Sequence, residues 1–499
     1  MNKCIRLLAA ATALFAASVG WAQTSGTILG TITDPGGAVI VGAKVTVVNE
    51  RTGESRNVAT DNTGGFSFPS LQPGGFTVRI ESSGFQKYES KSNVLSSSER
   101  LTLGNIQLTI GAVSDTVSVV AEGTRVQTAS SEGSALLTTA QIDSIAQKGR
   151  VLTNYLLLLP GVATNGGTSD AASGFVTVPN ANGLSNQMMT ISVDGLQGAD
   201  LGSQQLFQGS QNPDSVQEIK VLLNNYQAEY GRNGGATVNL ITKSGTRDFH
   251  GTAYWFKRHE MFNANSFFNN RSGLAKTKYR FNTRGATLGG PGTIPGLRNA
   301  TKDKLFFFYS YDDNPSTTTP ASSSKTTMPT ALERNGDFSQ SFAPSATALT
   351  LMPVRDPVAG ATFPGNIIPA SRIDKNGQAL LNVFSIPNQL NRAVSLGAYN
   401  NEFFNVVPNV RPGHVFKIDY KPTANDSLYF RGSLLRFQSL RSSVTGWDFA
   451  RNSFSGQTKS AVLGYTRILN SNMVNEFTAG IRRPEEITTI DDNKGSRKT

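Results

Sequence analysis

Cysteine and histidine are scarce in the 499-residue sequence, which contains one cysteine and three histidines. Cys4 precedes an apolar stretch near the N-terminus, so a chain cleaved after that stretch has no disulfide and no thiolate metal site. His250, His259 and His414 share no metal-ligand spacing, and the sequence has no G-x-x-x-x-G-K-[ST] phosphate loop and no G-x-S-x-G nucleophile elbow. These absences argue against an enzyme, and we expect no metal and no cofactor.

Charged residues are also few, at 16% of the chain against about 25% in an average soluble protein. The chain contains 49 glycines, which separate short alternating runs, and this composition favours β-structure. The apolar run from Leu7 to Val19 follows Lys3 and Arg6 and is shorter than the roughly 18 residues that a membrane-spanning helix needs. Residues 1–22 therefore predict a cleaved signal peptide that exports the chain, and a membrane anchor is the less favoured alternative.

Positive charge gathers in one stretch of a chain whose formal net charge is +11. The stretch contains Lys257, Arg258, Arg271, Lys276, Lys278, Arg280, Arg284, Arg298, Lys302 and Lys304. In an exported protein such a cluster favours anionic lipid or lipopolysaccharide over nucleic acid as a partner, and a solvated face is the commoner alternative.

Residues 23–112 alternate apolar and polar side chains in short runs separated by glycine-rich turns. The alternation is seen in Ala43/Val45/Val47, Phe66/Phe68 and Phe76/Val78/Ile80. Short strands at this spacing predict a small antiparallel β-sandwich. The unit resembles the carboxypeptidase regulatory-like domain, a transthyretin-like fold often grouped with carbohydrate-binding modules. Its phenylalanines alternate as core residues do, which favours a structural spacer over a glycan-binding platform.

The segment DTVSVVAEG, within residues 113–123, predicts an isolated strand without an obvious hairpin partner. One interpretation makes it the last strand of the sandwich. The other treats it as an extended peptide offered to the open sheet edge of a partner, where main-chain hydrogen bonds supply the affinity.

Residues 124–246 predict a mixed α+β globule. A helix is expected over TTAQIDSIAQKG, with Thr139 as a candidate cap, and a second helix over RVLTNYLLLLPGV, which Pro160 and Gly161 stop. The strand MMTISVDG, the segment SVQEIKVLLNNYQAEYG and the strand ATVNLITKSG follow.

Residues 247–499 carry aromatic-rich runs of about ten residues, the length of a strand that crosses an outer membrane. In HVFKIDYKP, Phe416 and Ile418 share one face, while Lys417 and Asp419 share the other. Such alternation fits strands with lipid on one side and water on the other.

The interval 314–412 is rich in proline, serine and threonine. A structureless interval of this length is unexpected inside a compact soluble domain. In a membrane barrel it becomes a long extracellular loop, which is the interpretation we prefer.

Several short motifs, and the order of the units, resemble the TonB-dependent outer-membrane receptors of the Oar-like branch. The most specific are Leu159-Pro160-Gly161-Val162, Ile191-Ser192-Val193-Asp194-Gly195, Glu229-Tyr230-Gly231-Arg232, Ile241-Thr242-Lys243-Ser244-Gly245 and Phe249-His250-Gly251. The resemblance implies a mainly β fold with an N-terminal β-sandwich, an α+β plug domain and the first part of an antiparallel transmembrane β-barrel. It also implies a location in the cell outer membrane.

The same resemblance assigns a structural motif to the plug, the globule that blocks the barrel. Its residues are Asp194, Gly195, Glu229, Tyr230, Gly231, Arg232, Gly234 and Gly235. The three last glycines are expected to let the backbone turn where side chains would clash. Val238, Leu240 and Ile241 are expected to form the strand that leads to the barrel wall.

The resemblance also identifies DTVSVVA as a TonB box. Its proposed members are Asp115, Thr116, Val117, Ser118 and Val119. In the family this peptide pairs with a strand of TonB, a protein of the inner-membrane energising complex, and the pull rearranges the plug so that a bound solute passes. The solute is unknown, and a glycan or a chelate fits the family.

The chain departs from the family in strand number, since about seven strands are expected against roughly 22 in such a barrel. We therefore expect the N-terminal part of a longer receptor for energy-coupled transport of a solute across the outer membrane. Two alternatives stay open. One is a cell-surface carbohydrate-binding or adhesion protein without transport activity, and the other is the product of a broken gene.

Overall fold

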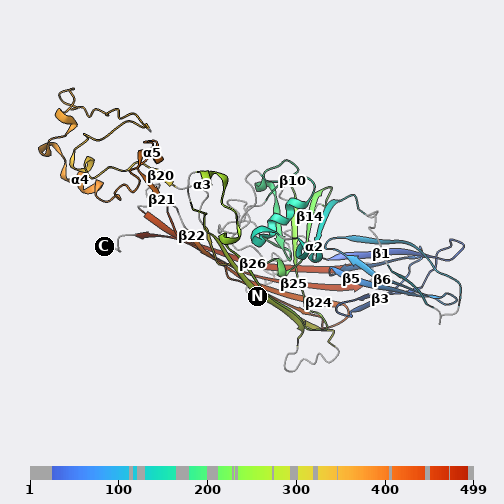
Figure 1. Ribbon diagram of the computed structural model, residues 1–499. Coiled ribbons are helices and arrows are strands. Elements are labelled where there is room, and N and C mark those ends of the chain that lie inside the picture. The colour runs from blue at the N-terminus through green and yellow to red at the C-terminus, as the bar shows by residue number, and fades with distance from the viewer. Residues whose placement is uncertain are drawn as a thin grey trace, which may run out of the picture.

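Three β-rich parts follow one another in the computed structural model: a sandwich, a mixed sheet with short helices, and a large antiparallel sheet (Figure 1). No helix in the described part of the chain is long and apolar enough to cross a membrane. The predicted signal peptide lies outside the described residues. The structure describes residues 25–111, 116–120, 130–145, 147–164, 179–198, 212–227, 230, 234–271, 275–292, 302–318, 324–345, 347–403, 407–443, 450–470 and 473–492.

The sandwich has one sheet in the order β4-β1-β7 and another in the order β3-β2-β5-β6-β8. Its strands are β1 Gly26–Thr33, β2 Lys44–Asn49, β3 Ser55–Ala59, β4 Gly65–Leu71, β5 Gly74–Glu81, β6 Lys87–Leu95, β7 Arg100–Gln107 and β8 Thr116–Val120. Phe66, Phe68 and Phe76 lie in its core, each at most 5% exposed. The pairs β1–β7 and β6–β8 are parallel, so the prediction of a purely antiparallel sandwich is wrong at these two pairs.

The second part is built on a sheet in the order β13-β12-β15-β14-β9. Its strands are β9 Gly133–Thr138, β10 Val162–Ala163, β11 Asn180–Ala181, β12 Thr190–Val193, β13 Leu196–Gln197, β14 Val216–Asn224 and β15 Thr237–Thr242. Its helices are α2 Thr139–Ser144 and the 3-10 helices η1 Lys148–Arg150, η2 Leu152–Leu158, η3 Asn186–Met188 and η4 Pro213–Ser215. All six side chains of β15 are buried, because this strand is central in the sheet.

The two predicted helices of this part are shorter or tighter than expected. α2 has six residues, and its cap is Thr138 rather than Thr139: the Thr138 side chain accepts from the Gln141 backbone, and the Gln141 side chain bonds back. The second segment is the 3-10 helix η2. Its buried Leu152 and Tyr155 are three residues apart, and this spacing puts both on one face of a 3-10 helix.

The third part is a nine-stranded antiparallel sheet. Its strands are β16 His250–Arg258, β17 Tyr279–Pro291, β18 Leu305–Asp313, β19 Ser316–Thr318, β22 Val407–Val410, β23 Gly413–Tyr420, β24 Asp426–Ser443, β25 Ala450–Asn470 and β26 Met473–Asp492. Seven are long and two, β19 and β22, are short, which agrees with the expected count of about seven. β24, β25 and β26 run for 18, 21 and 20 residues, well beyond the ten or so predicted.

The outward face of this large sheet exposes apolar side chains, and on β23 polar ones are buried opposite them, which is the reverse of a strand in a water-soluble protein. On β23, Phe416 and Ile418 are 40% and 39% exposed, whereas Lys417 and Asp419 are 5% and 3% exposed. The strand register carries the apolar outward face across the sheet, because cross-strand partners share a face. One such row contains Leu288, Tyr309, Phe416, Gly432, Ala461 and Ile481.

The interval 314–412 contains much regular structure. Besides β19 and β22 it holds β20 Ser324–Thr326, β21 Asn401–Phe403, α4 Lys375–Leu381, α5 Arg392–Ser395, η6 Glu333–Asn335, η7 Pro364–Asn366 and η8 Ala370–Arg372. The buried Arg334 organises it by donating to four carbonyl oxygens, those of Pro329, Leu381, Phe384 and Ser385. The unit that carries α4 and α5 lies at the end of the large sheet away from the sandwich (Figure 1). At the first bend after β16, η5 Glu260–Phe262 and α3 Phe267–Arg271 are short helices.

Candidate coupling segment and plug–barrel contacts

The predicted coupling peptide is the strand β8, which includes Thr116 and Val119. β8 pairs in parallel with β6 over five residues and is the end strand of its sheet. Val117 is 37% exposed and Ser118 is exposed. Asp115 lies outside the described residues. The peptide is thus the last strand of the sandwich, and no strand in the described part of the chain pairs with its outer edge.

Asp194 stands at the tip of a two-residue hairpin between β12 and β13, where Val193 faces Leu196. Asp194 and Gly195 have φ of 47° and 83°. A type I′ hairpin turn needs positive φ at both central residues, and Asp-Gly is one of the sequences that adopt it readily. We call the second and third parts of the structure the plug and the barrel part, after the predicted units. The turn places the Asp194 carboxylate at an end of the sheet of the second part, where it reaches the large sheet.

The Asp194 carboxylate is 2% exposed and lies against two barrel cations. Its oxygens are 3.6 Å from Lys417 Nζ and 3.5 Å from Arg431 Nε. Within the plug it accepts from Thr242 N at 3.0 Å and from Thr242 Oγ1 at 2.6 Å. Burial raises the pKa of Asp194, but the two cations and the Thr242 bonds together hold that pKa below its ordinary value. Asp194 is therefore a buried anion that joins plug to barrel.

The barrel side of this contact places like charges opposite each other. Lys417 and Arg431 are direct cross-strand partners on β23 and β24, a pairing that is unfavourable by itself. Asp194 between them offsets the repulsion. Lys417 Nζ also donates to Thr242 O at 3.2 Å, and the Tyr429 hydroxyl donates to Asp194 O at 3.0 Å. We call this set of contacts the barrel junction.

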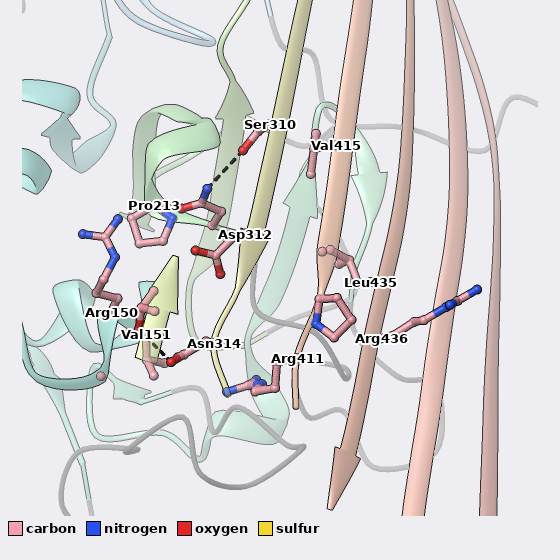
Figure 2. Close-up of a pocket in the computed structure, with 15 residues that line it drawn as sticks. Arg150, Val151, Pro213, Ser310, Asp312, Asn314, Arg411, Val415, Leu435 and Arg436 are labelled. Carbon is pink, nitrogen blue, oxygen red and sulfur yellow. Dashed lines mark hydrogen bonds between the residues drawn. The ribbon is translucent and has the colours of Figure 1, made fainter. Parts of the chain in front are cut away.

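A second contact between plug and large sheet surrounds a small cavity (Figure 2). Asn212 of the plug donates to the Tyr254 hydroxyl at 2.8 Å and to Ser310 Oγ at 3.0 Å. Arg150 pairs with Asp214 within the plug and lies over the Tyr254 ring, 5.1 Å from its centre. The cavity measures about 30 Å³, which is enough for water but not for a solute.

A third contact joins the sandwich to the plug, and we call it the sandwich junction. Glu218 and Lys220 project from one face of β14 and are 6% and 3% exposed. Glu218 accepts from Ser97 N at 2.7 Å, and Lys220 donates to Ser98 O at 3.2 Å. Lys220 also pairs with Glu132 at 2.8 Å. Burial is the main cause that raises the pKa of Glu218.

The remaining motif residues contribute unevenly. Tyr230 is 6% exposed and donates its hydroxyl to Ser98 Oγ. A Cβ at Gly235 would stand 3.0 Å from Met188 O, which fits the expected need for glycine. Gly234 departs from that expectation, since a Cβ there would meet no atom closer than 3.8 Å. The other three residues, Glu229, Gly231 and Arg232, lie outside the described residues.

Sequence reasoning missed the cationic partners of the motif. Lys417 and Arg431 come from β23 and β24, far along the chain from Asp194. A signal was present, since Lys417 and Asp419 alternate with the apolar residues of their strand. Charges on one face of an otherwise apolar strand indicate a buried polar contact when the apolar face is the exposed one. Glu218 and Lys220 give the same signal inside β14.

Among the residues described by the structure, no group of three or more histidine, cysteine, aspartate or glutamate side chains is arranged to hold a metal ion. The three contacts differ in kind: the barrel junction pairs opposite charges, the second contact is made of hydrogen bonds between neutral side chains, and the third joins charged side chains to backbone groups.

Residues 241–499 match the family model described as outer membrane beta barrel domain. Because this match covers more than half of the 499 residues, the chain belongs to the outer-membrane β-barrel family, and its location is the outer membrane. Residues 27–109 match the carboxypeptidase regulatory-like domain.

One curated relative is the TonB-dependent transporter Oar of Myxococcus xanthus, 26% identical over 323 residues. The match covers 60% of this chain and 27% of that protein, so the chain spans about a quarter of this relative's length. Among solved structures, the outer membrane transporter YddB of Escherichia coli aligns with a TM-score of 0.45 at 10% identity, covering 71% of this chain and 39% of that one. The siderophore receptor PirA of Pseudomonas aeruginosa aligns with a TM-score of 0.39 at 13% identity, covering 71% and 41%.

These comparisons confirm the resemblance to Oar-like TonB-dependent proteins and the mainly β fold class with a partial barrel. The curated relative is a transporter, which agrees with the expectation that the chain is not an enzyme. The comparisons do not test the unit boundaries, the coupling residues or the signal peptide, which stay predictions.

Proposed function

We propose that the protein acts in energy-coupled transport of a solute across the outer membrane, as the plug-bearing part of a TonB-dependent receptor. The observation that carries the proposal is the barrel junction. A globule is fastened by the buried Asp194 to the inward face of a sheet whose outward face is apolar. A plug bound in this way obstructs the space that the sheet borders, so passage needs energy that moves the plug.

The unit assignments belong to this proposal. We assign residues 1–22 to the signal peptide, 23–112 to the regulatory-like sandwich, 113–123 to the coupling segment, 124–246 to the plug and 247–499 to the barrel part, with 314–412 as an extracellular loop. The partner is TonB, which binds the coupling segment by strand addition. β8 supports this role because it is an edge strand with exposed side chains at Val117 and Ser118.

Lipid and lipopolysaccharide are proposed partners of the outward face of the large sheet. Toward the loop end, the apolar rows give way to basic side chains, as expected where a strand leaves hydrocarbon for phosphate-bearing headgroups. These outward basic residues are Lys257, Arg280, Arg284, Arg436, Lys459 and Arg483. Glu260 and Asp313 offset part of the charge by pairing with Arg280 and Arg284.

A second candidate is a surface protein that binds carbohydrate or mediates adhesion without transport. The observation in its favour is the regulatory-like sandwich at residues 27–109. The burial of Phe66, Phe68 and Phe76 weighs against it, because sugar-binding sites usually present exposed aromatic rings. The solute of the transport proposal is a chelate or a glycan.

The test replaces Val117 and Val119 together with proline, which removes two backbone donors from β8 and prevents strand addition. The full-length protein is expressed in cells that contain TonB, and TonB is crosslinked and recovered with the outer-membrane fraction. We expect the proline variant to lose at least about nine-tenths of the TonB signal. Ser118→Ala is the matched control, since it keeps every backbone donor of β8, and it should retain the signal.

Three results would contradict the proposal. The first is recovery of the protein in the soluble fraction, because the outward face requires lipid. The second is a TonB signal that the prolines leave unchanged, and the third is the absence of a TonB signal from the unmodified protein. If the protein then binds a glycan array equally with and without the prolines, the adhesion candidate is favoured.

A further inference from the structure

β8 differs from the other edge strands of the sandwich in having no residue that protects its edge. Natural edge strands avoid unwanted pairing by carrying charged residues or proline. β3 contains Arg56, β4 contains Pro69 and β7 contains Arg100. β8 reads Thr-Val-Ser-Val-Val, without charge or proline. Among the described residues, no strand pairs with its outer edge. β8 is therefore the sandwich edge best suited to accept another strand.

We propose that the partner strand adds to the outer edge of β8 while β8 stays paired with β6, so that the sandwich sheet continues into the partner. This inference rests on the proposed function, in which TonB binds the coupling segment. It differs from a mechanism in which β8 first separates from β6 and then pairs with the partner. The partner here is an extended strand with an unpaired edge of its own, and the sandwich is the platform that presents β8 to it.

Hydrogen bonding favours addition over removal. The inner edge of β8 is engaged with β6 along the full five residues of the strand. Removing β8 would leave the backbone groups of both strands without these partners, and each would need a replacement. Addition at the outer edge instead gives partners to backbone groups that bond to no strand of the described residues. The exposed Val117 and Ser118 side chains leave both faces of the strand accessible for this step.

The arrangement also determines how a force applied to β8 is transmitted to the rest of the protein. The ladder transmits it to β6, which ends at Leu95. Two residues later the chain reaches the sandwich junction, where Ser97 N binds Glu218 and Ser98 O binds Lys220. Both partners stand on β14 of the plug. Force applied to the partner strand therefore enters the plug sheet through the sandwich, as well as along the chain toward Glu132.

A reversible crosslink between β6 and β8 tests the inference. Glu89 and Ser118 are cross-strand partners, and the Glu89 side chain forms surface ion pairs with Arg79 and Lys91. We would make Glu89→Cys/Ser118→Cys in a Cys4→Ser background of the full chain. The reduced form of the same protein serves as its folding control. The matched crosslink Thr46→Cys/Asn57→Cys joins β2 and β3 at the opposite edge of the same sheet.

Binding of the purified periplasmic domain of TonB is then measured for the oxidised and reduced proteins. We expect the dissociation constants of the two forms to agree within about threefold, as for the control crosslink. A larger loss confined to the oxidised Glu89→Cys/Ser118→Cys protein overturns the inference, because β8 then has to leave β6. If neither the disulfide nor a short bifunctional thiol reagent joins the two cysteines, the inference is overturned too, since β8 then does not lie beside β6.

The outcome also separates this inference from the proposed function. If the unmodified protein does not bind the TonB domain, the proposed function fails. If it binds and only the oxidised variant does not, the function stands and the presentation of β8 on the sandwich is wrong.

Discussion

The plug is held by two buried ionic junctions that differ in their chemistry. At the barrel junction one carboxylate, Asp194, faces two cations, Lys417 and Arg431, and accepts two further bonds from Thr242. At the sandwich junction Lys220 pairs with Glu132 and donates to Ser98 O, while Glu218 accepts from Ser97 N and has no cation in an ion pair with it among the described residues.

This difference has an energetic consequence. The excess of positive charge around Asp194 favours its ionised form and lowers its pKa, in spite of complete burial. Around Glu218 the burial cost is not fully offset, and its pKa is raised. At the barrel junction the charges therefore stabilise the ionised form of Asp194. At the sandwich junction burial destabilises the ionised form of Glu218. We infer that the sandwich junction is the one that opens more readily.

The largest loss of stability is expected from Asp194→Ala. The substitution leaves Lys417 and Arg431 buried, opposite each other and without their shared anion, and breaking a buried pair costs about 3–5 kcal/mol. Thermal unfolding in detergent, with hydrogen exchange of Thr237–Thr242 as a local probe, should show early loss of the plug contact. Asp356→Ala is the control, because Asp356 pairs with the exposed Arg372 in the loop unit and its loss should leave plug exchange unchanged. Equal exchange in both variants would contradict the role of Asp194.

A smaller loss is expected from Lys220→Met, which strands the buried Glu132 and removes the bond to Ser98 O. Since one charge rather than two is left without its partner, we expect the free energy of unfolding to fall by about 3 kcal/mol, with the loosening confined to the sandwich junction. Hydrogen exchange should rise at residues 96–99 and stay unchanged in β15. Lys87→Met is the control, as its pair with Glu81 is exposed and worth at most about 1 kcal/mol. A response spread evenly over both junctions would show that they are not separate.

The two junctions should respond to pH in opposite directions. The pKa of Asp194 is lowered in the folded protein. Its contribution to stability is therefore fully present above the ordinary pKa of about 3.9 and is lost as the pH falls through the lowered pKa. Glu218 has a raised pKa, so its contribution is present below about 4.3 and is lost as pH rises through the raised value.

Calorimetry between about pH 3 and pH 8 checks these signs. Glu218→Gln should be more stable than the unmodified protein at neutral pH, with the gain disappearing in acid. Asp194→Asn should be less stable at neutral pH, with the deficit shrinking in acid. The same sign for both variants at neutral pH would remove the distinction between the junctions.

The fold followed from local patterns wherever one face of a strand is uniform. The alternation in the sandwich and in HVFKIDYKP identified the buried faces, and the Asp194-Gly195 dipeptide marks a hairpin by its own backbone preference. The helices were less predictable. Gln141 stands three residues after Thr138, and this T-x-x-Q capping-box spacing favours Thr138 over Thr139, so the cap could have been identified from the sequence.

The candidate site was predictable only in part, because its partners come from distant strands. Asp194 was singled out from its motif, but nothing local in the sequence connects it to Lys417 or Arg431. The parallel pairing of β6 with β8 likewise depends on the tertiary fold, since parallel neighbours are never joined by a tight turn. The polar composition of residues 314–412 predicts a long loop and gives no sign of its regular structure, because Arg334 binds carbonyl groups that are far apart in the chain.

The smallest effect is expected from Tyr230→Phe, which removes the hydroxyl that donates to Ser98 Oγ and keeps the buried ring. One hydrogen bond of this kind contributes about 1 kcal/mol, so the sandwich junction should loosen without separating. Hydrogen exchange at residues 96–99 should rise by less than in Lys220→Met. Tyr309→Phe is the matched control, because its hydroxyl bonds to His414 on the outward face, away from both junctions. If Tyr230→Phe raises exchange in β15 as much as at residues 96–99, the tyrosine supports the plug sheet itself, and the sandwich junction consists of Glu132, Glu218 and Lys220 alone.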